Sequence, residues 1–262
     1  MDMSDLTPTV TIPVELEEVK QYRPLSVLAV WAAAAVPMGV LAWVVVPAVA
    51  GQGATVSRFA VTLIAALTVG LVWQCVLALS LVAFEQRSLR WAVVRDALWL
   101  RAPSDPSGRR GGRLWLWTLA FGLGFMMLQF VPFGLSEPTD RSLGEFLNSP
   151  GGQETLHGNW GLFALVCAMM LFNTVAGEEL LFRGLLLPRM RGAFGRADWV
   201  VNGVLTGLYH LHQPWSIPGA TVAGTFLLAY PTRRFRSAWM GIAVHSMQSV
   251  FFAALVFMVV IR

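Results

Sequence analysis

Glu178, Glu179 and Arg183 place three charges within six residues, directly after an uncharged run at residues 162–176. An ionisable group inside a membrane-spanning helix costs about 2.5–3.5 kcal/mol on insertion scales, so such a cluster indicates a functional site. On a helix Glu179 and Arg183 are i,i+4 neighbours that can form an ion pair. Glu178 is rotated by about 100° from Glu179 and is free to face a cavity. The alternative is a helix end whose charges are solvated in the cytosol.

Two histidines complete the candidate site. His210 and His245 lie in apolar C-terminal segments, and Ser249 follows His245 by one turn, where it could orient the imidazole or donate toward a shared site. His212 lies about 200° round a regular helix from His210, so we do not expect these two to bind one ligand. Each histidine alone is typical of a packing residue. An acidic pair and two histidines on three membrane helices together indicate one site. His157 is expected at the surface.

A carboxylate and two imidazoles support a narrow range of chemistry. The carboxylate can take a proton from water, and the imidazoles can hold that water, bind a metal or stabilise an oxyanion. The sequence has no nucleophile elbow, no His-Glu-x-x-His zinc motif and no phosphate-binding glycine loop. Cys75 and Cys167 lie in apolar runs without a basic neighbour, so we interpret them as packing residues. The residues therefore predict water activation rather than covalent catalysis.

The composition predicts an all-α, polytopic membrane protein. Of the 262 residues 56% are hydrophobic and 13% are charged, whereas soluble domains average about 25% charged residues. Residues 1–24 are polar and acidic, which predicts a cytoplasmic tail and no cleavable signal peptide. Residues 25–262 are expected to form a single transmembrane domain. Its apolar runs predict about seven crossings, at 25–50, 57–84, 114–135, 162–182, 198–213, 219–231 and 237–261, of which the sixth is short.

The arginines predict the orientation of these crossings. Seven arginines fall in the segment 85–113, and further clusters fall at 189–196 and 233–236. By the positive-inside rule these segments are cytoplasmic, so the loop 136–160 is outside, the N-terminus inside and the C-terminus outside. Glu178 then lies toward the cytoplasmic half, and the site is expected in a cytosol-facing cavity. The segment 85–113 also reads as an amphipathic interfacial stretch. Gly203 and Gly207 form a small-xxx-small face that lets a neighbouring helix approach.

These residues resemble the CPBP family, the CAAX-protease and bacteriocin-processing membrane proteins also called Abi proteins. Its Glu-Glu-x-x-x-Arg motif is intact at Glu178–Arg183. Its Phe-x-x-x-His motif reads Thr206 to His210, with threonine in place of the aromatic residue. Its His-x-x-x-Asn motif reads His245 to Ser249, with serine in place of asparagine. The resemblance covers a core at about residues 160–253.

The resemblance implies an intramembrane endopeptidase, usually classed as a metalloprotease and related to type II CAAX prenyl endopeptidases. Glu178 would be the general base and His210 its partner on the catalytic water or metal. His245 with Ser249 would stabilise the oxyanion or complete a metal site, and Glu179 with Arg183 would brace the helix. Glu178, His210 and His245 are thus the candidate ligands of a divalent metal such as zinc.

Two alternatives to an enzyme stay open. A non-catalytic immunity or scaffold protein could retain the fold, and the residues Thr206 and Ser249 are what a decaying site would show. A proton-coupled transporter is less favoured, because the sequence has no detectable internal repeat. For an enzyme the expected partners are a membrane-associated peptide or protein substrate and the lipid bilayer, with no nucleic acid. The expected location is the plasma membrane, and a prenylated substrate is not assumed.

Overall fold

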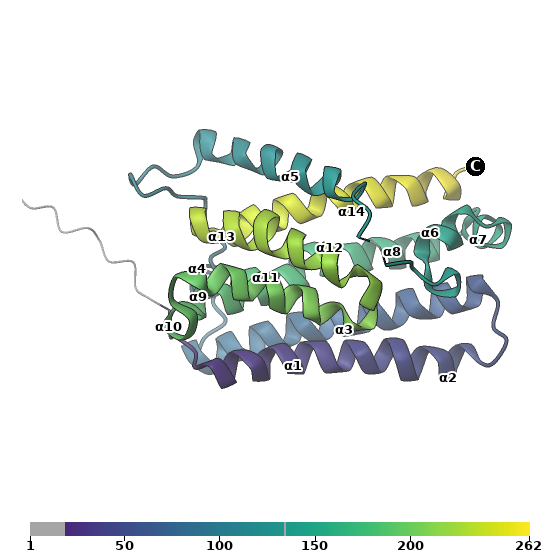
Figure 1. Ribbon diagram of the computed structural model, residues 1–262, viewed down its shortest axis with the longest axis horizontal. Coiled ribbons are helices and arrows are strands. Elements are labelled where there is room, and N and C mark those ends of the chain that lie inside the picture. The colour runs from purple at the N-terminus through teal and green to yellow at the C-terminus, as the bar shows by residue number, and fades with distance from the viewer. Residues whose placement is uncertain (1–18, 134) are drawn as a thin grey trace, which may run out of the picture.

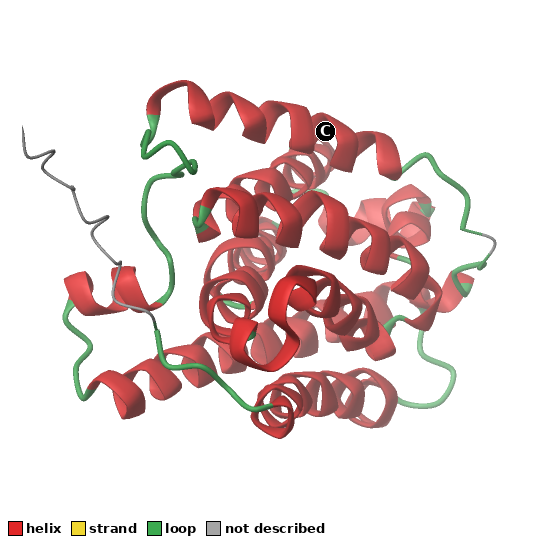
Figure 2. Cartoon of the chain, turned by 60° about the vertical axis from the view of Figure 1, so that its left-hand side comes forward, coloured by secondary structure: helices red, strands yellow, loops and turns green. Residues whose placement is uncertain are grey.

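A computed structural model describes residues 19–133 and 135–262 of the chain. Within these residues all regular elements are helices, apart from one isolated bridge between Ser104 and Arg110. Figure 2 shows the same result as helices joined by loops without a strand in the described part. The predicted all-α class is therefore confirmed. Of the predicted tail 1–24, residues 1–18 lie outside the described residues.

Four helices are long and apolar enough to cross a membrane. The first, Pro24–Ala50, runs from α1 (Pro24–Val40) through a π-helical turn into α2 (Val46–Ala50). The second is α3 (Val56–Gln86). The third, Trp160–Arg189, contains α8 (Trp160–Leu171) and α9 (Leu187–Arg189), and the fourth is α14 (Ala238–Val260). These helices confirm an integral, polytopic membrane protein.

Three of the seven predicted crossings fall outside this set. The run 114–135 forms a shorter apolar helix, Gly112–Leu128, which contains α5 (Leu116–Leu128). The run 198–213 forms α11 (Asp198–Tyr209), which has only 12 residues because the regular helix ends before His210. The run 219–231 forms α12 (Ile217–Val222), a π-helical turn (Ala223–Ala229) and α13 (Tyr230–Phe235), which ends in charged residues. Sequence hydropathy could not show that α11 ends at Tyr209.

The short helices lie at the two ends of the bundle. Figure 1 shows α4 (Trp91–Ala97), α9 and α10 (Arg191–Phe194) at one end and α6 (Leu143–Asn148) and α7 (Pro150–Leu156) at the other. The first end also brings two arginine-rich segments together. There Ser104 N donates to Phe235 O at 2.8 Å, and the Ser237 hydroxyl donates to Arg101 O at 2.5 Å. Because both arginine-rich segments lie at the same end of the bundle, the arginines are on one side of the molecule, as the sequence predicted.

Helix α11 packs closely against the helix formed by α12, the π-helical turn and α13. A Cβ atom on Gly203 would lie 2.3 Å from Thr225 Cα, and one on Gly207 would lie 2.9 Å from Thr221 Cα. Only glycine allows two backbones to come this near. The predicted small-residue face is therefore confirmed, and it fixes the helix that leads to His210.

Candidate functional site

The acidic pair lies where the third long helix changes its hydrogen bonding. A π-helical turn (Phe172–Ala176) precedes Gly177, and a second (Leu180–Leu186) follows Glu179. A Cβ atom on Gly177 would lie 2.5 Å from Phe172 O and 2.6 Å from Leu71 O of α3. π-helical turns inside α-helices often mark functional sites, because they rotate the following side chains relative to the helix before them. Here they set Glu178 and Glu179 in the protein interior, with both side chains buried.

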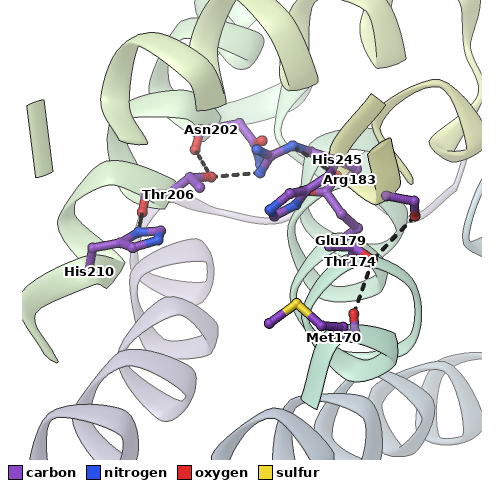
Figure 3. Close-up of polar contacts among 9 residues, drawn as sticks. Met170, Thr174, Glu179, Arg183, Asn202, Thr206, His210 and His245 are labelled. Atoms are coloured by element: carbon purple, nitrogen blue, oxygen red, sulfur yellow. Dashed lines mark hydrogen bonds and ion pairs between the residues drawn. The ribbon is translucent and has the colours of Figure 1, made fainter. Parts of the chain in front are cut away.

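Glu179 is the centre of a buried polar cluster (Figure 3). Its Oε2 atom lies 3.5 Å from Arg183 Nε, so the predicted i,i+4 ion pair is present. Its Oε1 atom lies 3.1 Å from Nδ1 of His245 on α14. Both carboxylate oxygens thus face a cationic or donating group. The link to His245 joins residues 66 positions apart and could not be read from local spacing.

Thr206 ties the same cluster to α11. Its hydroxyl accepts a hydrogen bond from Arg183 Nη1 at 2.6 Å and donates to Asn202 O at 2.9 Å. The threonine therefore does more than replace an aromatic wall. It holds the guanidinium that neutralises Glu179. Sequence reasoning missed this contact, although a hydroxyl one turn before His210 was the signal that could have suggested it.

The hydrogen bonds of the imidazoles determine which ring nitrogen is available. His245 Nδ1 faces a carboxylate, and His210 Nδ1 lies 2.9 Å from the carbonyl oxygen of Thr206. The Glu179 carboxylate oxygen and the Thr206 carbonyl oxygen can only accept a hydrogen bond, so the Nδ1 atom of each imidazole is the donor and carries the hydrogen. In the neutral rings each Nε2 is therefore left as an acceptor. A carboxylate behind Nδ1 also fixes the orientation of the ring.

A cavity of about 460 Å³ brings the predicted residues together. Glu178, His210, His245 and Ser249 all line it, whereas Glu179 and Arg183 lie behind its wall. Thr206, His212 and the amides of Asn173, Gln129, Gln213 and Gln248 add further polar groups. The rest of the lining is mainly apolar, from residues such as Met38, Leu67, Leu71, Phe125, Met169 and Phe252.

The groups that could share one metal ion differ from the predicted set. Among the described residues, single ligand atoms of Glu178, Glu179 and His245 lie within 4.8 Å of one another, and His210 is not part of this group. Glu179 already interacts with Arg183 and His245. The Arg183 guanidinium repels a divalent cation at Glu179. Without Glu179 the group offers only Glu178 and His245, fewer than the three or four protein ligands that zinc normally takes. The residues therefore do not fit a zinc site well.

His210 and His212 lie in a turn that is not regular α-helix. The regular helix ends at Tyr209, and His210–His212 form a 3₁₀ turn. In this turn the two rings stack with centroids 5.3 Å apart, and His212 also lines the cavity. The expectation that the two would not bind one ligand assumed a regular helix, which ends before them, and it stays a prediction. Trp43 of the first long helix stabilises the turn, since its indole N–H donates to Leu211 O at 2.9 Å.

Other predicted residues behave more simply. Ser249 is buried and lines the cavity, but the group that contacts His245 Nδ1 is Glu179 rather than Ser249. His157 is exposed, as predicted. Cys75 and Cys167 are free thiols that are partly buried. Tyr209 is a residue that sequence reasoning missed: its hydroxyl accepts a hydrogen bond from the buried Gln74 of α3 at 2.7 Å, close to the histidine turn.

Comparison with known proteins identifies one family. Residues 159–251 match the family described as Type II CAAX prenyl endopeptidase Rce1-like. The matched segment contains Glu178, His210 and His245 together with the helices that position them. No curated protein and no solved structure matches the chain. The family resemblance drawn from the three short motifs is therefore confirmed.

Proposed function

We propose that this chain is a membrane endopeptidase, on the premise that its residues 159–251 match the Type II CAAX prenyl endopeptidase Rce1-like family. It hydrolyses a peptide bond of a membrane-associated protein or peptide. The observation that carries this proposal is that the Glu178 carboxylate and the His245 imidazole line the same cavity, with ligand atoms within 4.8 Å of each other. The Nδ1 atom of His245 is hydrogen-bonded to Glu179. A buried carboxylate beside oriented imidazoles is the arrangement that water activation needs.

Glu178 is the general base in this mechanism. It takes a proton from a water molecule as the water oxygen attacks the scissile carbonyl carbon, and a tetrahedral oxyanion forms. Glu178 then returns the proton to the nitrogen of the leaving amine, and the carbon–nitrogen bond breaks. A positioned general base typically contributes about 10²–10⁴-fold in rate. Glu178 is suited to this role because it faces the cavity, whereas the neighbouring Glu179 is paired with Arg183.

In this mechanism the imidazoles and Ser249 form hydrogen bonds to the attacking water and to the oxyanion. His245 offers its Nε2 atom while Glu179 holds Nδ1, so the imidazole keeps one orientation through the reaction. His210 is held by the bond from its Nδ1 to Thr206 O, so its Nε2 can accept a hydrogen bond from the attacking water. Ser249 offers a hydroxyl from the same cavity wall. A single oxyanion donor is worth about 10²–10³-fold in rate.

Water activation in this proposal does not use a metal ion. The expected zinc ligands Glu178, His210 and His245 do not form one group, and the group that does form contains the ion-paired Glu179. We therefore expect proteolysis to survive prolonged treatment with a chelator. Activity that a chelator abolishes and added zinc restores would show that the ligands rearrange around a metal.

The apolar lining supports a substrate that arrives through the membrane. Most of the cavity wall consists of side chains such as Leu67, Phe125 and Met169 rather than charged groups. Such a surface binds an apolar segment and excludes bulk water from the carboxylate. The proposal is therefore limited to membrane-associated substrates, and their sequence is left to experiment.

The scaffold alternative loses its main support in the structure. It rested on Thr206 and Ser249 as signs of a decaying site. Thr206 instead accepts from Arg183 at 2.6 Å and donates to Asn202 O at 2.9 Å, and Ser249 lines the cavity. Both residues are thus integrated into the arrangement that surrounds Glu178.

The proposal can be tested by mapping new peptide termini. The wild-type protein and Glu178→Gln are reconstituted separately into membranes that contain the proteins of the native host, and new C-termini are identified by mass spectrometry. We expect a set of termini in membrane-associated proteins with the wild type that is absent with Glu178→Gln. Identical sets of termini with both proteins would overturn the proposed function.

A further inference from the structure

A second cavity, here called the basic pocket, lies away from the candidate site at the end of the bundle that carries α10. It measures about 450 Å³ and is lined by residues of α10, α11, α13 and the turn before α11. Four of its residues are arginines, namely Arg191, Arg196, Arg233 and Arg234, and one is an acid, Asp198. None of these residues lines the cavity around Glu178.

The charges of the basic pocket are only partly balanced. Arg233 Nε lies 2.7 Å from Oδ2 of the buried Asp198, so the one acid of the pocket is already paired. Within residues 19–133 and 135–262, Arg191, Arg196 and Arg234 have no carboxylate within ion-pair distance. Three positive charges therefore line one hollow. Planar guanidinium groups suit the oxygens of a phosphate, which they can bind in a bidentate way.

Aromatic rings border the basic pocket on its apolar side. The rings of Trp199 and Tyr230 line it, with their centroids 5.3 Å apart, and Phe226 lies 5.9 Å from Trp199. Tyr230 is 40% exposed and Phe226 is 55% exposed. Tryptophan and tyrosine are enriched at the level of lipid headgroups, because one end of each ring is apolar and the other polar. The basic pocket is therefore placed at a membrane–water interface.

An exposed apolar stripe leads away from the basic pocket along α11. It consists of Val200, Val204 and Leu208, which are all exposed and follow the i, i+4, i+8 spacing of one helix face. The stripe begins next to Trp199 in the pocket. At 1.5 Å per residue it is roughly 12 Å long, close to the ~15 Å hydrocarbon thickness of one leaflet. Free phosphate would use the arginines but would leave this stripe unused.

We propose that the basic pocket binds the phosphate headgroup of an anionic phospholipid whose acyl chain lies along the apolar stripe of α11. Arg191, Arg196 and Arg234 contact the phosphate, while Arg233 stays bound to Asp198. The pocket shares its end of the bundle with the other arginine-rich segments, where the positive-inside rule places the cytoplasmic leaflet. Anionic lipids are concentrated in that leaflet. This inference does not depend on the proposed proteolysis.

The test compares two triple variants of equal charge. The pocket variant is R191Q/R196Q/R234Q. The control variant is R90Q/R110Q/R113Q, which changes exposed arginines of the arginine-rich segment 85–113 that do not line the pocket. Binding of short-chain phosphatidylglycerol, phosphatidylcholine and inorganic phosphate to each purified protein is measured by native mass spectrometry. The melting temperature of each protein in detergent shows that it is folded.

We expect the wild type and the control variant to retain phosphatidylglycerol over phosphatidylcholine. The pocket variant should bind phosphatidylglycerol at least about tenfold more weakly, since each basic residue near an anionic lipid adds about a fivefold preference. An equal loss of phosphatidylglycerol binding in both variants would show a non-specific charge effect and would contradict a binding site in the basic pocket. If inorganic phosphate bound the pocket as tightly as phosphatidylglycerol, the proposed lipid would be wrong, and the pocket would be a site for free phosphate.

Discussion

At the scale of single residues, the site depends on the partners of one buried carboxylate, that of Glu179. Glu179 lies between Arg183 and His245, and Arg183 is held in turn by Thr206. Among the described residues, Arg183 Nε and Nη2 have no hydrogen-bond partner, and the contact from Nε to Glu179 is an ion pair at 3.5 Å. A buried guanidinium with so few partners is sensitive to the loss of another one.

Thr206→Val tests this sensitivity. Valine keeps the shape of threonine but removes the oxygen that accepts from Arg183 Nη1, so we expect stability to fall by about 1–3 kcal/mol. The matched control is Thr68→Val, because the buried Thr68 hydroxyl donates only to Ile64 O of its own helix. Thermal unfolding in detergent should show a clear loss for Thr206→Val and little change for Thr68→Val. Equal melting temperatures for both variants would contradict the role of Thr206.

At the scale of elements, two irregular turns set the geometry of the site. The π-helical turns around Gly177 and the 3₁₀ turn His210–His212 place side chains that a regular helix would turn elsewhere. Gly177 is where this geometry meets a neighbouring helix, since the carbonyl oxygen of Leu71 lies where a Cβ atom would be. The site therefore requires close backbone contact between α3 and the helix of Glu178.

Gly177→Ala should disturb that contact. Its Cβ atom would lie within 2.6 Å of two backbone oxygens, so α3 or Glu178 must move. We expect a loss of about 1–3 kcal/mol in stability, as for other overpacked cores, together with lower proteolytic activity. Gly39→Ala is the control, because no atom lies within 4 Å of a Cβ there. That variant should be neutral or slightly more stable, by up to about 1 kcal/mol. The same melting temperature and activity for Gly177→Ala and wild type would contradict the tight contact.

The sequence predicted those parts of the site that depend on local spacing. The pair of Glu179 and Arg183 follows from i,i+4 geometry, and the close approach at Gly203 follows from side-chain size. Two other features could not be predicted this way. The contact between Glu179 and His245 joins separate helices, and the stacking of His210 on His212 depends on where α11 ends. Such breaks are decided by tertiary packing, which intrinsic helix propensity does not contain.

At the scale of the whole molecule, the two ends of the bundle differ in charge. The segments around Arg101 and Phe235 are joined by hydrogen bonds at one end, whereas α6 and α7 lie at the other. The same end carries the basic pocket. Hydropathy alone does not reveal that the run 198–213 leaves the regular helix after Tyr209. Charge asymmetry survives such breaks, since it depends only on the loops.

Reporter fusions test the resulting orientation. A reporter fused after Arg110 or Arg234 should be cytoplasmic, and one fused near Asn148 on α6 should be exported, because the arginine-rich end is retained inside. Alkaline phosphatase, which is active only when exported, and green fluorescent protein give complementary readouts. An exported reporter at Arg110 would place the arginine-rich end outside and reverse the proposed orientation.

The most direct measurement compares Glu178→Gln with wild type on a cleaved membrane-associated substrate. Glutamine keeps the volume and hydrogen bonds of Glu178 but cannot accept the proton, so kcat should fall by about 10²–10⁴-fold while the melting temperature stays the same. Glu154→Gln on α7 is the control for the removal of one negative charge, because Glu154 is exposed and lies outside the cavity. It should keep full activity. A Glu178→Gln protein that is folded and cleaves the substrate at the wild-type rate would contradict the role of Glu178 as the general base.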